Sequence, residues 1–329
     1  MPPKMTKAII SDQFGDPDVY AIREIPSRAP GKGEIRVALK AIGISYVDVL
    51  TAMGKYQVTP PLPFIPGSEC AGEVLEVGEG VTAFAIGDAV MGSSFGGIFA
   101  EEGTFRASSF SKVPAGMSLE QAAVFPPSYL TATHALCDRG KLSAGGVLLV
   151  LGAGGATGIA AIQVGKALGA RVIASASTQD KRDLALAAGA DAAIDTRSAT
   201  WRDLVKAAAG GKGTVDVVFD PVGGSMTDPA FRTLGYDGRY LVIGFTGGIS
   251  TLKTNLPLVK TASLIGVQLR VFGEQEPEKM AQTRARMNVW AAEGKLQPVI
   301  GKAYAFDQFR AAMEDAFAGK TAGRVILKV

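Results

Sequence analysis

The sequence is short of the residues that bind metals and form disulfides. Its 329 residues include only two cysteines, Cys70 and Cys137, and one histidine, His134. It contains no CxxC pair and no Cys/His cluster, so neither a metal site nor a disulfide framework is predicted. Two isolated cysteines are typical of a protein kept in a reducing compartment, and we expect a cytoplasmic protein.

The chain also has no large excess of positive or of negative charge. The 34 basic and 31 acidic side chains leave a net charge of +3, and no block of like charges occurs. This balance argues against a nucleic-acid partner. The first residues, MPPKMTKAII, lack the apolar core and the cleavage site of a signal peptide.

One long stretch lacks charge altogether, between Lys141 and Lys166. Its length would allow a membrane span. However, glycines interrupt it between residues 152 and 158, and each costs about 1 kcal/mol in a helix relative to alanine. The apolar run before them, Val147–Leu151, has the length of a strand. We therefore expect a buried strand followed by a loop, and no membrane partner.

What is present from Val147 onward is an alternation of apolar strands with helical patterns. Strands are expected at 147–151, 170–175, 191–196, 214–222, 238–245 and 262–269. Near-continuous apolar strands separated by helices predict a doubly wound parallel sheet that is covered on both faces. The last of these strands, ASLIGVQL, is a candidate exposed edge that could pair across a two-fold axis in a homodimer.

The first 125 residues have a different pattern. Short β runs such as GEIRVALKAIGI and ECAGEVLEVG alternate with glycine- and proline-rich turns such as VTPPLPFIPG. This composition predicts a compact β-barrel or sandwich. An amphipathic helix at 277–295 is followed by a strand–helix–strand pattern that reaches the C-terminus. The length of the chain suits two domains.

The glycines after Val147–Leu151 match a dinucleotide-binding loop, read as Ala153-x-Gly155-x-x-Gly158. The first glycine of the usual pattern is replaced by alanine. Gly155 would let the backbone approach a pyrophosphate, and Gly158 would permit tight helix–strand packing. The N–H groups of Ala156, Thr157 and Gly158 would face the anion. The alternative is a tight strand-to-helix turn without a ligand.

The residues after the next strand indicate which dinucleotide binds. An NAD site places an acidic residue about 20 residues beyond the loop, but Ser175, Ala176 and Ser177 occupy that stretch. Lys181 and Arg182 follow. A hydroxyl with a cation suits a 2′-phosphate, so Ser177 and Lys181 predict NADPH. Alternatively, Lys181 is a solvated helix residue behind a cap at Ser177 or Thr178.

Across its whole length the chain resembles the medium-chain dehydrogenase/reductase superfamily, and its zinc-independent quinone oxidoreductase branch most of all. The stretches that carry the resemblance include GISYVDVLTAMGKYQ, PPLPFIPGSECAGEVLEVGEGV, LGAGGATGIAAIQVGKALGA, DPVGG and GRYLVIGFTGG. The resemblance implies an α/β protein with a GroES-like β-barrel catalytic domain, residues 1–125 and 296–329. It also implies a Rossmann cofactor domain, a doubly wound parallel sheet at residues 126–295.

The resemblance also reveals a missing metal site. Zinc-dependent members have a cysteine where this chain has Ser45, and a histidine where it has Ser68. Two serines cannot supply the thiolate, imidazole or carboxylate ligands that zinc requires, so no metal is expected. Without a Lewis acid to polarise an ordinary carbonyl, the hydride acceptor must itself be electrophilic, as quinones and enones are.

On the substrate side, the resemblance places Tyr56 close to the nicotinamide as a candidate proton donor, although water or simple packing would serve as well. Ser45, which stands where relatives often have asparagine, and Tyr46 lie in a substrate-binding segment. Arg270 replaces a frequent tryptophan beside the substrate cleft. Asp48 is expected to cap the local backbone rather than to act as a base.

On the cofactor side, the resemblance assigns Thr131 to the nicotinamide ribose. Gly244 and Phe245, expected at a strand end, and Val267 and Leu269, on the neighbouring strand, would line the crevice at the strand ends. Thr196 stands where relatives often have a tyrosine near the adenosine phosphate. His134, one turn after Thr131, is expected to be a partly buried structural histidine.

These observations predict a cytoplasmic NADPH:quinone oxidoreductase that acts on a small quinone or enone. Two alternatives remain at this stage. One is a reductase of 2-enoyl thioesters or α,β-unsaturated carbonyls, and the other is an NADPH-binding sensor or structural protein without turnover.

Overall fold

The computed structural model describes residues 4–211 and 213–329. The chain forms two compact units, each with its own core. The first contains Met1–Pro127 and Pro298–Val329, and the second contains Ser128–Gln297. The divisions lie two residues further along the chain than the predicted boundaries. No helix in the described part of the chain combines the length and apolar character that a membrane crossing needs.

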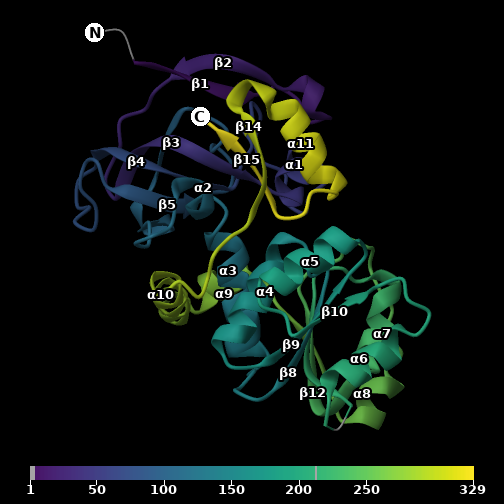
Figure 1. The fold of residues 1–329 in the computed structure, drawn as a ribbon. Helices are drawn as coiled ribbons and strands as arrows, with labels where there is room; N and C mark the ends of the chain where they lie inside the picture. Colours follow the sequence, from purple (N-terminus) through teal and green to yellow (C-terminus); the bar gives the residue numbers. More distant parts are fainter. Residues whose placement is uncertain (1–3, 212) are drawn as a thin grey trace. The chain divides into compact units, whose positions relative to one another are not determined.

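The first unit is built on a largely antiparallel sheet with the order β14-β15-β3-β4-β5-β7, in which β6 also pairs with β3 (Figure 1). A separate hairpin pairs β1 with β2. The strands are β1 (Met5–Ile10), β2 (Ala21–Pro26), β3 (Glu34–Ile44), β4 (Glu69–Val77), β5 (Ala89–Ser93), β6 (Glu102–Arg106), β7 (Phe110–Lys112), β14 (Ile300–Ala305) and β15 (Arg324–Lys328).

The long strand β3 shows why this sheet folds as it does. Its first half alternates buried and half-buried residues, so that Ile35, Val37 and Leu39 all point into the core. The helices of this unit are α1 (Tyr46–Ala52), α2 (Leu119–Ala122) and α11 (Phe309–Ala318), with 3₁₀ turns η1 (Pro17–Val19), η2 (Ala107–Ser109) and η5 (Phe306–Gln308). Phe309 and Met313 of α11 are buried in the same core.

The second unit is a six-stranded parallel sheet with the order β10-β9-β8-β11-β12-β13. Its strands are β8 (Val147–Leu151), β9 (Arg171–Ala176), β10 (Ala192–Asp195), β11 (Val215–Asp220), β12 (Leu234–Val242) and β13 (Ser263–Gly266). The chain winds outward from β8 to β10 and then returns to continue from β11 to β13. The order therefore reverses beside β8, the point at which such sheets bind ligands.

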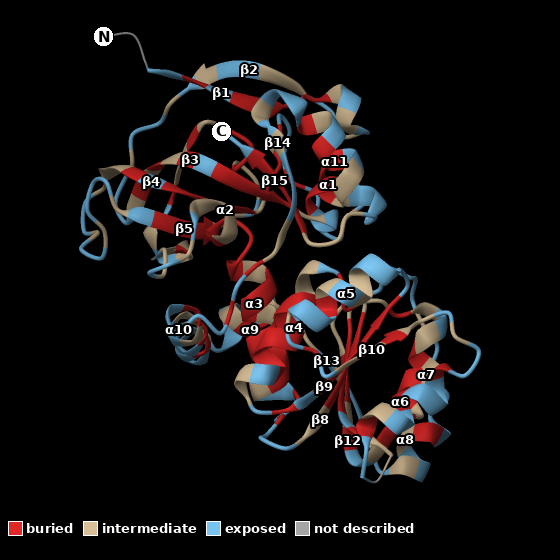
Figure 2. Ribbon diagram, viewed as in Figure 1, coloured by how far each residue is buried: buried red, intermediate tan, exposed pale blue. Residues whose placement is uncertain are grey.

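Helices cover both faces of this sheet, with α4 on one face and α6 to α8 on the other (Figure 1). Strands β8, β9 and β11 and most of α4 are buried, whereas the edge strand β13 is largely exposed (Figure 2). The helices are α3 (Pro126–Thr133), which continues as the π-helix η3 (His134–Arg139), α4 (Ala156–Ala167), α5 (Gln179–Ala187), α6 (Trp201–Ala209), η4 (Gly224–Met226), α7 (Thr227–Phe231), α8 (Asn255–Lys260), α9 (Leu269–Gln275) and α10 (Pro277–Ala292).

The end of the sheet differs from the prediction in two places. Strand β12 stops at Val242, so Gly244 and Phe245 lie in the loop just beyond it. Strand β13 stops at Gly266, and the Gln268 side chain accepts hydrogen bonds from the N–H groups of Arg270 and Val271. This cap starts α9, so Leu269 lies on a helix and not on the predicted strand. The predicted edge position of β13 is confirmed.

Candidate functional site

The turn from β8 into α4 has the shape of an anion-binding loop. Gly152 has a left-handed φ of +58°, and the N–H of Gly155 donates to its carbonyl at 3.0 Å. Gly155 is the N-cap of α4 and has no side chain to cap the helix. The first N–H groups of any helix lack partners within that helix. Those of Ala156, Thr157 and Gly158 therefore suit a bound phosphate.

The two glycines of this turn have different surroundings. A methyl group added at Gly158 would lie 2.4 Å from the carbonyl oxygen of Gly152 and 2.8 Å from the Cα of Ala153. A methyl group added at Gly155 would have only the Gly152 oxygen nearby, at 3.3 Å. Gly158 is thus required by the fold itself, whereas Gly155 leaves room outside the turn for a ligand.

The first turn of α5 packs against the same loop. A methyl group added at Gly154 would lie 2.5 Å from the Cβ of Lys181, so the lysine stem crosses the glycine loop. Thr178 is the N-cap of α5 and accepts from the N–H of Lys181 at 3.4 Å. Ser177 is exposed directly after β9. The structure therefore brings Lys181 to the glycine loop, leaves Ser177 exposed just after β9, and identifies Thr178 as the cap.

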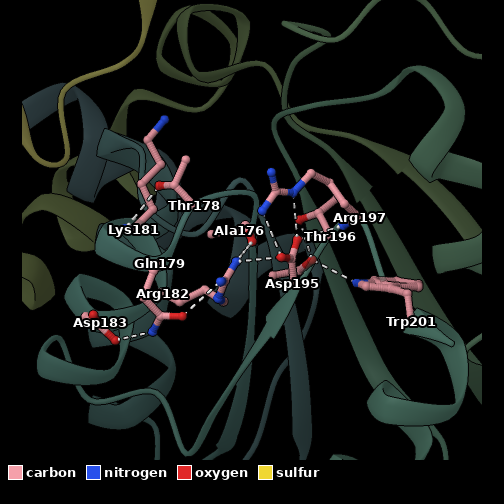
Figure 3. Close-up of polar contacts among 11 residues, drawn as sticks. Ala176, Thr178, Gln179, Lys181, Arg182, Asp183, Asp195, Thr196, Arg197 and Trp201 are labelled. Atoms are coloured by element: carbon pink, nitrogen blue, oxygen red, sulfur yellow. Dashed lines mark hydrogen bonds and ion pairs between the residues drawn. The ribbon is translucent and has the colours of Figure 1, made fainter. Parts of the chain in front are cut away.

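Beside this loop lies a polar cluster that the sequence reasoning missed (Figure 3). Asp195 ends β10 and forms ion pairs with Arg182, at 3.2 Å, and Arg197, at 3.0 Å. Thr196 points inward, where its hydroxyl and the indole N–H of Trp201 both contact the buried Ser175 hydroxyl at 2.9 Å. The only sequence signal was the DTR triplet at the end of a predicted strand.

The loops after β11 and β12 pack against each other. The Asp220 carboxylate accepts the N–H groups of Val222 and Gly223 at 2.8 Å, together with the hydroxyl of Tyr240 at 2.5 Å. Burial raises the pKa of Tyr240, so it stays a donor. A methyl group added at Gly223 would meet the Cα of Phe245 at 3.3 Å. Asp220 thus holds the loop that packs against Gly244 and Phe245.

Thr131 and His134 lie on one continuous helical segment, α3 and η3. Thr131 is half-buried, and His134 is buried. The His134 ring stacks on Phe272 at 3.7 Å between centroids, and its Nδ1 contacts the Asp138 carboxylate at 2.9 Å. These contacts are those of a structural histidine. Val267 lies between β13 and α9, while Arg270 is exposed on α9 and pairs with Glu274.

In the first unit, the predicted substrate residues surround α1. The Ser45 hydroxyl donates to Asp48 at 2.6 Å, and the Asp48 carboxylate accepts from the N–H of Ser45 at 2.7 Å, which confirms the predicted cap. Tyr46 follows directly and stacks on Phe317 at 5.3 Å. Tyr56 is half-buried in the loop beyond the other end of α1. Ser45 and Tyr46 therefore lie together, whereas Tyr56 is separated from them by the helix.

Ser45 and Ser68, which the resemblance aligns with metal ligands of zinc-dependent relatives, lie in one polar group around Asp48. The Ser45 hydroxyl donates to the carboxylate of Asp48, which is 3% exposed, and the Ser68 hydroxyl is close enough to lower the pKa of that carboxyl. Burial raises the pKa of Asp48, while the serine hydroxyls and Arg324 oppose that rise. Two hydroxyls on one carboxylate do not make a zinc ligand set. In residues 4–211 and 213–329, no three His, Cys, Asp or Glu side chains are grouped to hold a metal ion.

A buried ion pair lies next to this group. Glu69, at the start of β4, pairs with Arg324, at the start of β15, and both side chains are buried. Burial raises the pKa of Glu69 to about 7, because the loss of hydration outweighs the attraction of Arg324. The pair links two strands that both pair with β3.

Comparisons with known proteins agree with both units. The model of the alcohol dehydrogenase GroES-like domain matches residues 31–135, and that of the zinc-binding dehydrogenase domain matches residues 156–285. The predicted GroES-like and Rossmann folds are thereby confirmed. The chain is 34% identical to mouse quinone oxidoreductase-like protein 2, over 94% of this chain and 88% of that protein.

Solved structures give the same result. A mycobacterial quinone oxidoreductase is 30% identical, with a TM-score of 0.87 over 98% of this chain and 100% of its own. A mycobacterial protein solved in complex with NADPH is similar to the same extent, with 30% identity, a TM-score of 0.87 and the same coverage of both chains. One of the two family models is named for zinc binding, whereas the resemblance predicts serines, Ser45 and Ser68, at two of the metal-ligand positions.

Proposed function

Because the chain belongs to the quinone oxidoreductase branch of the medium-chain dehydrogenase/reductase superfamily, we propose that it is an NADPH-dependent, zinc-independent reductase of quinones or similarly activated acceptors. The observation that carries this proposal concerns the two positions that the resemblance aligns with metal ligands. Both hold serines, Ser45 and Ser68, whose hydroxyls stabilise the charged form of the buried Asp48 carboxylate. A site with such donors favours acceptors that need no Lewis acid.

The cofactor would bind to the second unit. The N–H groups at the start of α4, from Ala156 to Gly158, would hold the pyrophosphate, with Gly155 leaving space for it. Ser177 and Lys181 would hold the 2′-phosphate, which is supported by the packing of Lys181 across the glycine loop. NADPH supplies a hydride when bound. Residues assigned to its nicotinamide end are Thr131, Gly244, Phe245, Val267 and Leu269.

The acceptor would be bound by Ser45, Tyr46, Tyr56 and Arg270. Stacking on Phe317 orients the Tyr46 ring, and the Ser45–Asp48 cap holds the segment in front of it. Tyr56 would donate a proton to the reduced acceptor from the loop after α1. Orientation of the acceptor, rather than chemical activation by a metal, then accounts for most of the rate.

Steady-state assays with a panel of quinones and with crotonyl-type thioesters test this function. We expect NADPH oxidation with quinones and little with thioesters, ketones or plain aldehydes. Oxidation of NADPH by thioesters alone would make the chain an enoyl reductase. Tight NADPH binding without turnover of any acceptor would make it a binding protein.

The role of Tyr56 needs a separate variant. Tyr56→Phe keeps the ring and removes the proton, so we expect kcat to fall about 100-fold if the phenol is the general acid. An unchanged kcat with a quinone would assign the proton to water. Tyr304→Phe is a matched control, because the Tyr304 hydroxyl instead donates to Asp315 between β14 and α11.

We further propose a cytoplasmic homodimer. Both cysteines are free, as a reducing compartment would maintain them. Strand β13 ends the sheet and exposes Leu264, so it offers an edge to a second copy. Light scattering of the wild type and of Leu264→Lys tests this: we expect a dimer that the lysine weakens. A monomeric wild type would contradict it.

A further inference from the structure

Asp195 lies beside the strand end that is expected to reach the cofactor ribose, where an acidic residue ordinarily favours NADH over NADPH. It is the last residue of β10, and it is in register with Ala176, the last residue of β9. In doubly wound sheets, the tip of the strand that follows the glycine-loop helix reaches the ribose 2′ position. In this sheet that strand is β9. A free carboxylate beside that tip would accept the ribose hydroxyl of NADH and repel a phosphate.

The carboxylate of Asp195, however, has no acceptor capacity left. One oxygen, Oδ1, accepts the backbone N–H of Arg197 at 2.9 Å and its Nε at 3.1 Å. The other, Oδ2, lies 3.0 Å from Nη2 of Arg197 and 3.2 Å from Nη1 of Arg182. A carboxylate offers about four lone-pair sites; hydrogen bonds from Arg197 take three of them, and the Arg182 guanidinium lies in ion-pair contact beside the fourth. The Arg197 hydrogen bonds hold the pKa of Asp195 well below its usual range, so it stays charged.

The two arginines have different surroundings. The Arg182 side chain is 14% exposed and also donates to the Ala176 carbonyl at 3.2 Å and to Gln179 at 2.9 Å. Arg182 thus ties the first turn of α5 to the strand ends. The Arg197 side chain is 69% exposed. Its guanidinium carries about five N–H groups. Two bond Asp195, and the others meet no acceptor among the described residues.

The side chain of Thr196 does not point outward, so it cannot contact a ligand at the end of β10. Thr196 directs its hydroxyl to the buried Ser175, and Ser175 also accepts the indole N–H of Trp201 (Figure 3). The next residue, Arg197, is therefore the first after β10 whose side chain reaches solvent with a fixed orientation. Lys181 immediately precedes Arg182, which pairs with the same carboxylate from the opposite element.

We propose that Arg197 is a specificity-determining residue for the adenosine 2′-phosphate, and that Asp195 is the positioning residue that orients it. This inference rests on the proposed use of NADPH. A guanidinium held at one edge keeps its other N–H groups in the planar arrangement that matches phosphate oxygens. Asp195 thereby contributes to phosphate binding through Arg197, although its own charge has the wrong sign.

Calorimetric titrations with 2′,5′-ADP and with 5′-ADP test both residues. We expect Arg197→Ala to weaken 2′,5′-ADP by about 10- to 100-fold, the effect of losing one charge-assisted hydrogen bond, and to leave 5′-ADP unchanged. Asp195→Asn should also weaken 2′,5′-ADP, although simple charge repulsion predicts the reverse. Arg202→Ala, at an exposed arginine of α6, is the matched control and should change neither affinity.

The outcomes separate this inference from the function on which it rests. A wild type that binds both nucleotides equally would overturn the NADPH assignment itself. A wild type that prefers 2′,5′-ADP, with an Arg197→Ala variant that keeps the full preference, would overturn the role of Arg197 alone. Tighter binding of 2′,5′-ADP by Asp195→Asn would show that Asp195 repels the phosphate and does not position Arg197. Because the Arg197 side chain is exposed, Arg197→Ala should fold, and it tests the role of Arg197 even if Asp195→Asn fails to fold.

Discussion

Two alanine substitutions in the glycine loop, Gly158→Ala and Gly155→Ala, should have different effects. The first should lower the stability of the fold, and the second should lower the affinity for NADPH. At Gly158 the new methyl group would lie 2.4 Å from a backbone oxygen and 2.8 Å from a backbone Cα. Neither atom can rotate away, so we take the upper end of the overpacking range, about 3 kcal/mol. Alanine regains about 1 kcal/mol as the better helix former.

The net loss for Gly158→Ala is therefore about 2 kcal/mol. A domain of this size loses about 2–4 °C of Tm per kcal/mol, so its unfolding should move down by about 4–8 °C. Differential scanning calorimetry without added nucleotide measures this shift. The second unit contains the loop, and its transition is the one expected to move.

Gly155→Ala is the matched control for stability. Its backbone, with φ of −88° and ψ of 172°, suits alanine, and only one atom approaches the new methyl group closely. The weaker N-cap and the stiffer unfolded chain offset each other, so stability should change by less than about 1 kcal/mol. NADPH affinity should nevertheless fall at least about tenfold, because the methyl group would take up space beside the helix N–H groups that the phosphate is proposed to use.

Unfolding of Gly158→Ala at the wild-type temperature would contradict the fold requirement, since the turn would then yield easily. Binding of NADPH by Gly155→Ala with wild-type affinity would contradict the ligand requirement. In that case the loop would be a tight strand-to-helix turn without a phosphate.

Three further predictions follow from the site. Lys181→Ala should weaken NADPH at least about tenfold and NADH little; equal losses in a fluorescence titration would remove Lys181 from the 2′-phosphate site. Burial raises the pKa of Glu69 to about 7 from the ordinary value of 4.5 for a glutamate in water. Its contribution to folding is therefore fully present below pH 4.5 and is lost as the pH rises through 7. In urea unfolding, the stability advantage of the wild type over Glu69→Gln should shrink between pH 5 and about pH 8, and a growing advantage would reverse the assigned sign. Prolonged chelation should leave quinone reduction unchanged, whereas activity that vanishes and returns with zinc would refute the metal-free site.

The parts of the fold that could be predicted are those that depend on neighbouring residues. The apolar run Val147–Leu151 is long enough for one buried strand, and the glycines after it force a turn before α4. The same local logic placed the Asp48 cap, because capping involves residues three apart. It failed after Gly266, where the Gln268 cap converts a continuous apolar run into the start of α9.

The sequence by itself therefore determined the strand–helix alternation and the glycine turn, and it led to the prediction that Ser45 and Ser68 replace metal ligands. Only the tertiary structure decided which side chains complete each group. Asp195 meets Arg182 because β9 and β10 pair in one register, and Glu69 meets Arg324 because both strands pair with β3. Periodicity records which face of an element is buried, whereas contacts between elements depend on register and strand order, which no local pattern encodes.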